Sequence, residues 1–328
     1  MRRILQFSVF AIPQLLNSPI TRSLLALFLF LGSALAQAPQ TQPPPPPDQP
    51  VATLKVDVRL VNVFVTVLDA AGHPVGDLER KNFQVFEDGL KQEVAVFGRE
   101  SERPLSIVLA IDTSLSVRKD LRQELESARR FVHDVMRPVD RLSLYQFDAE
   151  VHELVPFTAD LRAIDAGIDR VRVGSSTSLY DAVYLGAEAL APRQGRKVMV
   201  VITDGGDTGS QVDYQAALQQ AIQSEAIVYS IIIVPIESSA GRNTGGEHAL
   251  IQFSHDTGGK YFYASTGREL DDAFRRIDRE LRTQYLLAYY PKQRFSDSDF
   301  RRIQITVQAG PQPLSTRHRS GYYLHPSK

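Results

Sequence analysis

Cysteine is absent from this sequence of 328 residues. Its absence excludes disulfide bonds, thiolate metal sites, cysteine nucleophiles and a lipid-modified N-terminal cysteine. A strong net charge is absent too, because 37 basic residues are set against 38 acidic ones and the formal net charge is -1. Nothing in this balance favours binding to nucleic acid, so we expect no nucleic-acid partner.

The signature motifs of several enzyme classes are also missing. The sequence contains neither a G-x-S-x-G elbow nor an H-E-x-x-H pair. Tyr261 follows Gly258-Gly259-Lys260, where a phosphate-binding loop would need Ser or Thr, and a phosphatase with an Asp nucleophile would need a second Asp in place of Ser114. The seven histidines show no metal-ligand spacing. We therefore expect that the protein is not an enzyme, with a metal-assisted hydrolase as the remaining catalytic alternative.

Residues 1–36 have the features of an export signal. Their only charges are arginines, which precede the apolar run Leu24–Leu31, and small residues follow at Ala34 and Ala36. This pattern predicts a signal peptide cleaved after Ala36, and hence a periplasmic or secreted protein. A helix from Leu24 to Ala38 would be about 22 Å long, shorter than the ~30 Å hydrocarbon core of a bilayer. The alternative is an uncleaved signal that anchors the chain, and this is the only membrane contact we expect.

Two β-rich segments flank the middle of the chain. A proline-rich linker, residues 37–52, leads into the first of them, residues 53–102, where every second residue from Val61 to Val67 is valine. The second segment, residues 284–328, begins with the strand-like run Tyr285–Tyr290. We hypothesise that the two segments pair into one small β-sandwich domain, because the ends of an inserted domain must lie close together. The alternative is two unrelated β-appendages.

Strands and helices alternate through residues 103–283. Short apolar runs such as Ile107–Ile111 and Val198–Thr203 are typical of strands buried on both faces of a parallel sheet. Between such runs, apolar residues at intervals of three and four predict amphipathic helices, for example over Lys119–Met136. This order predicts an α/β fold with a doubly wound, mostly parallel sheet.

Oxygen-bearing side chains follow the first of these strands. Asp112, Ser114 and Ser116 stand at alternate positions directly after the apolar run. The carboxyl ends of parallel strands are where α/β sheets bind ligands, and a carboxylate with two hydroxyls suits a hard cation such as Mg²⁺. By itself, the motif also fits a turn or a helix N-cap.

Two further residues extend this set. Thr177 stands just before the predicted helix Ser178–Leu190, where its hydroxyl either caps the helix or turns toward a metal. Asp204 directly follows the predicted strand Val198–Thr203. The combination of D-x-S-x-S, a Thr ahead of L-Y-D-A, and T-D-G after an apolar strand resembles the von Willebrand factor A family. There it forms the metal-ion-dependent adhesion site (MIDAS). The family's usual Gly-Gly-Thr is Ser175-Ser176-Thr177 here, which keeps the hydroxyl. The resemblance covers roughly residues 103–283, and the flanking segments resemble von Willebrand A-related proteins of acidobacteria.

The resemblance implies a site for one divalent ion, Mg²⁺ or alternatively Mn²⁺. Its implied ligands are Asp112, Ser114, Ser116, Thr177 and Asp204. Two carboxylates offset the charge of the ion and leave it able to bind an outside ligand, so a partner protein's Glu or Asp is expected to complete the coordination. The expected function is thus an exported, metal-dependent protein-binding or adhesion module. The alternative is a metal-independent structural subunit of a cell-envelope assembly.

Other acidic residues lie close to these ligands in sequence. Asp181 lies in the first turn of its helix, where its negative charge is expected to interact favourably with the helix dipole. It is also expected to orient water beside the ligands. Asp207 and Asp213 either form an adjacent cation site or have solvated loop or helix N-cap roles. The segment Glu237–Glu247 is expected to be a loop that borders the binding face and shapes its specificity, or else a plain surface loop.

Overall fold

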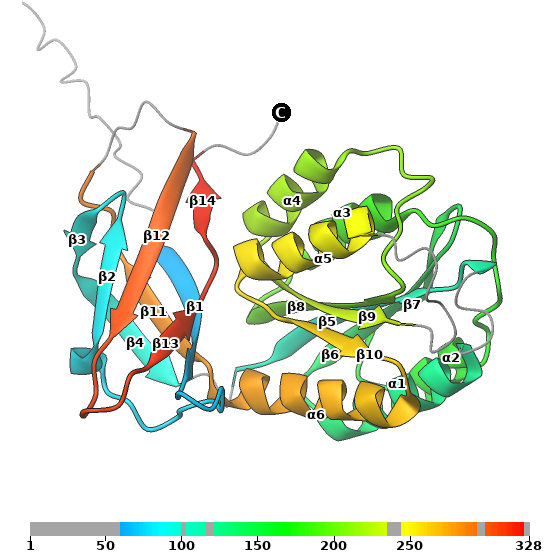
Figure 1. The fold of residues 1–328 in the computed structure, drawn as a ribbon, viewed down its shortest axis with the longest axis horizontal. Coiled ribbons are helices and arrows are strands. Elements are labelled where there is room, and N and C mark those ends of the chain that lie inside the picture. The colour runs from blue at the N-terminus through cyan, green and yellow to red at the C-terminus, as the bar shows by residue number, and fades with distance from the viewer. Residues whose placement is uncertain (1–59, 100–102, 116–120, 235–243, 294–298, 325–328) are drawn as a thin grey trace, which may run out of the picture. The chain divides into compact units, whose positions relative to one another are not determined.

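The computed structural model describes residues 60–99, 103–115, 121–234, 244–293 and 299–324. These residues form an α/β domain and a β-sandwich (Figure 1). Among them, no helix is both long and apolar enough to span a membrane. The predicted signal peptide, the proline-rich linker and Ser116 lie outside the described residues.

A six-stranded sheet forms the centre of the α/β domain, with the strand order β10-β9-β8-β5-β6-β7. All of its neighbouring strands are parallel except β7, which is antiparallel to β6. The bounds of the strands are β5 (Leu105–Asp112), β6 (Arg141–Phe147), β7 (Val151–Thr158), β8 (Arg196–Thr203), β9 (Ala226–Ile233) and β10 (Tyr261–Ala264).

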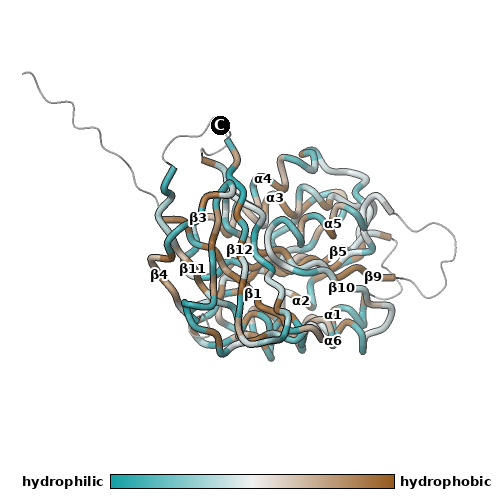
Figure 2. The backbone as a smooth tube through the Cα atoms, turned by 60° about the vertical axis from the view of Figure 1, so that its left-hand side comes forward, coloured by the Kyte–Doolittle hydropathy of each residue, from teal (hydrophilic) through white to brown (hydrophobic). Residues whose placement is uncertain are grey.

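Helices cover both faces of this sheet (Figure 1). One face packs against α1 (Leu121–Val135), α2 (Leu161–Ile168) and α6 (Gly267–Thr283). The other packs against α3 (Leu179–Leu190), α4 (Tyr214–Gln223) and α5 (Thr244–Thr257). In β5, Leu109 belongs to the first core and Val108 to the second, and both are completely buried. Burial on both faces explains why this strand has an unbroken apolar sequence, and Figure 2 shows a similar hydrophobic stretch along β9.

The β-sandwich combines strands from both ends of the described chain. One sheet has the order β13-β1-β11-β4 and the other β14-β12-β2-β3. Strand β1 pairs with β11 from Val61↔Tyr289 to Val65↔Tyr285, and Val61, Val63, Val65 and Val67 all enter the shared core. The bounds are β1 (Val61–Leu68), β2 (Phe83–Glu87), β3 (Leu90–Gln92), β4 (Val94–Arg99), β11 (Tyr285–Tyr289), β12 (Phe300–Val307), β13 (Ser315–Arg317) and β14 (Gly321–Tyr323).

A buried ion pair lies inside this sandwich. Glu87 and Arg301 are 2% and 1% exposed, and their side chains are 2.5 Å apart. The Tyr289 and Tyr322 hydroxyls donate to the second Glu87 oxygen at 2.7 and 2.9 Å. Such pairs are tolerated in a core when the remaining carboxylate lone pairs are also hydrogen-bonded, as they are here. The four residues connect β2, β11, β12 and β14, and so join the two sheets.

The predicted fold class is therefore confirmed: a doubly wound, mostly parallel α/β sheet with a β-sandwich built from N- and C-terminal strands. Two short strands, β3 and β13, were not expected from the sequence. The prediction of a loop over Glu237–Glu247 is wrong for its last residues, because α5 begins at Thr244; residues 235–243 lie outside the described part of the chain.

Candidate functional site

Asp112 is the last residue of β5 and is completely buried. Its Oδ1 accepts a hydrogen bond from the Ser114 backbone N–H at 2.8 Å, which closes a tight turn directly after the strand. Its Oδ2 accepts from the Thr203 hydroxyl at 2.6 Å. The carboxylate is thus held from two sides at the carboxyl edge of the sheet, where β5 and β8 lie next to each other.

The negative charge of Asp204 affects the pKa of Asp112. Burial raises the pKa of Asp112 from its ordinary value of 3.8 to about 6, against the lowering effect of its hydrogen bonds, and the charge of Asp204 raises it further. Asp204 directly follows β8 and is partly exposed. Within the described part of the chain, Asp112 forms no ion pair with a Lys, Arg or His. Two carboxylates therefore meet at this edge without a protein cation between them.

The loop that carries Thr177 is joined to the turn after β5. Gly174 donates its backbone N–H to the Thr113 carbonyl at 2.7 Å, and Leu115 donates to the Ser175 carbonyl at 3.2 Å. Thr177 itself is only 5% exposed. The N-cap of α3 is Ser178, not Thr177, so the capping alternative for Thr177 does not hold. Among the residues that the structure describes, the Thr177 hydroxyl has no hydrogen-bond partner.

Asp181 and Asp207 tie α3 to the loop after β8. Asp181 accepts hydrogen bonds from the backbone N–H groups of Gln211 and Val212 at 2.9 to 3.0 Å. In return, Asp207 accepts from the Tyr180 backbone N–H at 3.2 Å and from the Ser210 hydroxyl at 2.5 Å. We call this reciprocal arrangement the α3 clasp. Both carboxylates are engaged with protein donors beside the Thr177 loop.

Two threonines in this region, Thr203 of the T-D-G motif and Thr208, were not among the predicted ligands. Thr203 donates to Asp112 and also accepts from the Gly205 backbone N–H at 3.0 Å. The Thr208 hydroxyl accepts from the Thr177 backbone N–H at 3.0 Å, and the Thr208 backbone N–H donates to the Thr177 carbonyl at 2.8 Å. The sequence did offer a signal for Thr203, because it is a polar residue at the end of the apolar run that begins at Val198. The second depends on a loop-to-loop contact that spacing does not indicate.

Helix α5 lies against the loop after β8. A side chain at Gly246 would collide with the carbonyl oxygen of Gly205, so the helix approaches this backbone closely only because the residue is glycine. Gly205 itself has φ +99°, a conformation that also favours glycine. The first turn of α5 thus packs directly against Gly205, the residue that follows Asp204.

These side chains fit a divalent cation. Asp112 has a destabilised negative charge, Asp204 adds a second, and Thr177, a residue only 5% exposed, adds a hydroxyl without a partner in the described residues. Hard oxygen donors of this kind are the ligands that Mg²⁺ and Mn²⁺ prefer. In the same ranges, no group of three or more His, Asp or Glu could hold a metal ion. Any ion held by described side chains at this edge would therefore have at most two carboxylate ligands.

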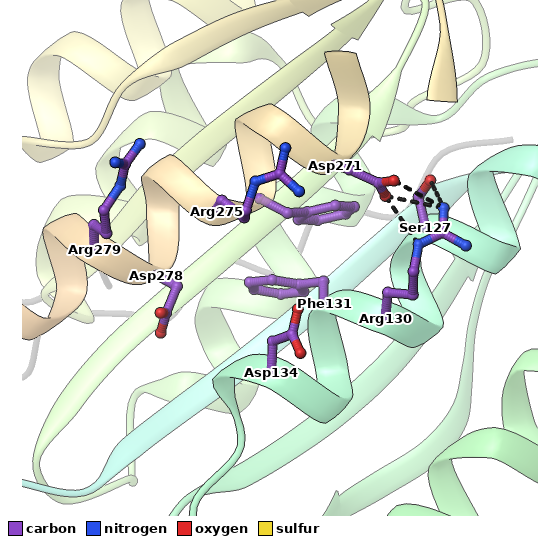
Figure 3. Close-up of a pocket in the computed structure, with 9 residues that line it drawn as sticks. Ser127, Arg130, Phe131, Asp134, Asp271, Arg275, Asp278 and Arg279 are labelled. Carbon is purple, nitrogen blue, oxygen red and sulfur yellow. Dashed lines mark hydrogen bonds and ion pairs between the residues drawn. The ribbon is translucent and has the colours of Figure 1, made fainter. Parts of the chain in front are cut away.

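A separate groove of about 350 Å³ lies between α1 and α6 (Figure 3). Phe131 and Phe274 stack at its base, with ring centroids 4.4 Å apart, and Arg130 pairs with Asp271 at 3.0 Å. Three arginines and three aspartates line it: Arg130, Arg275, Arg279, Asp134, Asp271 and Asp278. Since these charges balance, the groove offers no net charge to a ligand, and we assign it no function.

Comparison with solved structures finds similar chains at low sequence identity. An aerotolerance-related membrane protein from Bacteroides fragilis is 21% identical over 54% of this chain and 98% of its own, with a TM-score of 0.42. The vWF domain of a type V pili tip protein from Porphyromonas gingivalis is 16% identical over 54% and 94%, with a TM-score of 0.45. A von Willebrand factor type A protein from Catenulispora acidiphila is 10% identical over 80% and 73%, with a TM-score of 0.47.

No match was found among curated proteins. The family model of the von Willebrand factor type A domain matches residues 106–276, which is more than half of the chain. This range begins in β5 and ends in α6, and it contains every residue of the candidate site. The chain therefore belongs to the von Willebrand factor type A domain family.

Proposed function

We propose that this chain is an exported protein-interaction module that binds its partner through a divalent cation, Mg²⁺ or Mn²⁺. The ligands proposed are Asp112, Ser114, Ser116, Thr177 and Asp204. The observation that carries the proposal is the meeting of Asp112 and Asp204 at one sheet edge without a protein cation among the described residues. When bound, the ion would supply a Lewis-acidic position for an outside oxygen ligand. No catalytic step is part of this proposal.

The protein side chains have distinct roles in this scheme. Asp112 supplies buried negative charge and is oriented by Thr203, whose hydroxyl holds Oδ2 at 2.6 Å. Asp204 supplies the second charge, and Thr177 a neutral oxygen. Two carboxylates neutralise a divalent ion without making the site anionic, so an acidic side chain from a partner protein can approach it. Membership of the family and the predicted export signal support an interaction outside the cytoplasm.

The test compares Asp112→Ala with the wild type. We expect the substitution to abolish Mg²⁺ uptake in calorimetry and to abolish Mg²⁺-dependent capture of a partner from a cell-envelope extract. Glu126→Ala is the matched control, because Glu126 is an exposed carboxylate on α1. It should behave like the wild type.

Two results would count against the proposal. Partner capture that persists in EDTA would indicate a metal-independent structural subunit. A thermal midpoint that does not change with Mg²⁺ would have the same meaning, since a ligand that binds only the folded state must stabilise it.

A further inference from the structure

Two exposed aliphatic side chains lie on the loops that carry candidate metal ligands. Leu115 is 60% exposed and Val173 is 41% exposed. Single exposed apolar residues are ordinary on protein surfaces and need no explanation. These two are notable because each lies on a loop that carries a candidate ligand: Leu115 directly follows Ser114, and Val173 lies four positions before Thr177.

The two loops are fixed to each other. The hydrogen bonds from Gly174 to the Thr113 carbonyl and from Leu115 to the Ser175 carbonyl join them backbone to backbone, at 2.7 and 3.2 Å. Gly174 also lies against the Asp148 side chain, so closely that a side chain at position 174 would collide with it. Leu115 and Val173 are thus held on adjoining backbone segments at the same edge of the sheet as Asp112.

We infer that the partner presents its acidic residue next to aliphatic or aromatic residues, which pack on Leu115 and Val173. This inference rests on the proposed function and adds the chemistry of the partner. A bare metal–carboxylate contact would accept any exposed Glu or Asp. Discrimination between partners requires further contacts, and interfaces obtain them from an apolar centre surrounded by polar groups.

The occupant is therefore a peptide segment in which apolar side chains adjoin one carboxylate. The acid matches the positive charge of the ion, and the apolar neighbours cover two side chains that otherwise remain in water. A segment with an acid flanked only by polar residues would leave Leu115 and Val173 exposed, and it should bind more weakly.

A display library of short random peptides with a fixed central glutamate tests this inference. The full chain is immobilised, clones are bound in the presence of Mg²⁺, and bound clones are eluted with EDTA. We expect the positions adjoining the glutamate to be enriched in Leu, Ile, Val, Phe, Tyr or Trp. Leu115→Ser and Val173→Ser should each weaken binding of the selected peptides about tenfold, while Mg²⁺ uptake in calorimetry stays unchanged.

The control is Val139→Ser. Val139 is 55% exposed and lies just before β6 begins, at the opposite edge of the sheet from Asp112. This variant should bind the selected peptides like the wild type. Clones eluted by EDTA with no apolar preference, or selected peptides that bind the Leu115 and Val173 variants normally, would overturn the inference and leave the proposed function standing. If no clone is eluted by EDTA, both fail.

Discussion

At the scale of single residues, the candidate site depends on the environment of Asp112. Its carboxylate is completely buried, and the negative charge of Asp204 disfavours its ionised form. Only a few hydrogen-bond donors favour the ionised form. Each carboxylate oxygen has two lone pairs, so the bonds from Ser114 and Thr203 leave capacity for a cation. A proton and a metal ion would therefore compete for the same carboxylate.

The pH dependence of metal binding follows from this competition. With a pKa of about 6, Asp112 is mostly protonated at about pH 5 and mostly ionised at about pH 7.5. Because a proton and a metal ion compete for the carboxylate, we expect the Kd for Mg²⁺ to be about tenfold higher at the lower pH. Calorimetric titration at the two pH values measures it. Equal Kd values would show that Asp112 is not a ligand.

In the metal-free protein, the same raised pKa makes the folded state less stable as the pH rises. A folded-state pKa above the unfolded value of 3.8 means that the folded state holds the proton more tightly. The contribution of Asp112 to the free energy of unfolding therefore falls as the pH rises from about 4 to about 6, and it stays constant above that range. Added Mg²⁺ should stabilise the protein more at neutral pH than at acidic pH.

At the scale of elements, the α3 clasp holds the start of α3, two residues after Thr177. Asp181 of α3 binds the loop after β8, and Asp207 of that loop binds the start of α3. Residues that orient metal ligands in this way typically affect metal affinity by about 10- to 100-fold when they are removed.

We predict that Asp181→Ala weakens Mg²⁺ binding by about tenfold and lowers the free energy of unfolding by about 1 to 2 kcal/mol, because it leaves the Gln211 and Val212 N–H groups without their acceptor. Asp213→Ala is the control. Asp213 caps α4 by accepting from the Ala216 N–H at 2.8 Å. Its loss should cost similar stability with little change in affinity. If both variants lose affinity equally, the clasp has no special role.

The elements also show what the sequence could predict. Strands β5 and β8 were recognisable because burial on both faces demands a continuous apolar run, and Asp112 and Asp204 could be placed at one edge because the strands are parallel. The early start of α5 was missed because Gly245 and Gly246 read as loop residues, whereas Gly246 is required by the close approach to Gly205. The clasp was missed because carboxylate-to-backbone bonds between distant loops leave no periodic pattern.

At the scale of the whole molecule, the chain leaves the sandwich at the end of one strand, forms the α/β domain, and re-enters the sandwich at the start of the neighbouring strand. Strand β4 ends at Arg99, β11 begins at Tyr285, and these two residues are direct register partners. We propose, as the sequence suggested, that residues 53–102 and 284–328 form one domain into which residues 103–283 are inserted.

This arrangement predicts that the two parts fold separately. A fragment of residues 101–283 should be soluble, unfold cooperatively and bind Mg²⁺ like the full chain. A second chain, in which a short Asn-Gly turn joins Arg99 to Tyr285, should form the sandwich alone, because antiparallel neighbours accept a hairpin connection. Circular dichroism and thermal unfolding measure both. A fragment 101–283 that misfolds would contradict the insertion.

The register of Arg99 with Tyr285 also has a mechanical consequence. Adjacent strands lie about 4.8 Å apart, so the two covalent connections that would carry a pull from the metal edge to the sandwich enter it at nearly the same point. Both strands would be drawn in the same direction, and the ladder between them would not be unzipped. Resistance would come from β1, which borders β11 on its other side, and the tension would be shared by two segments of the chain.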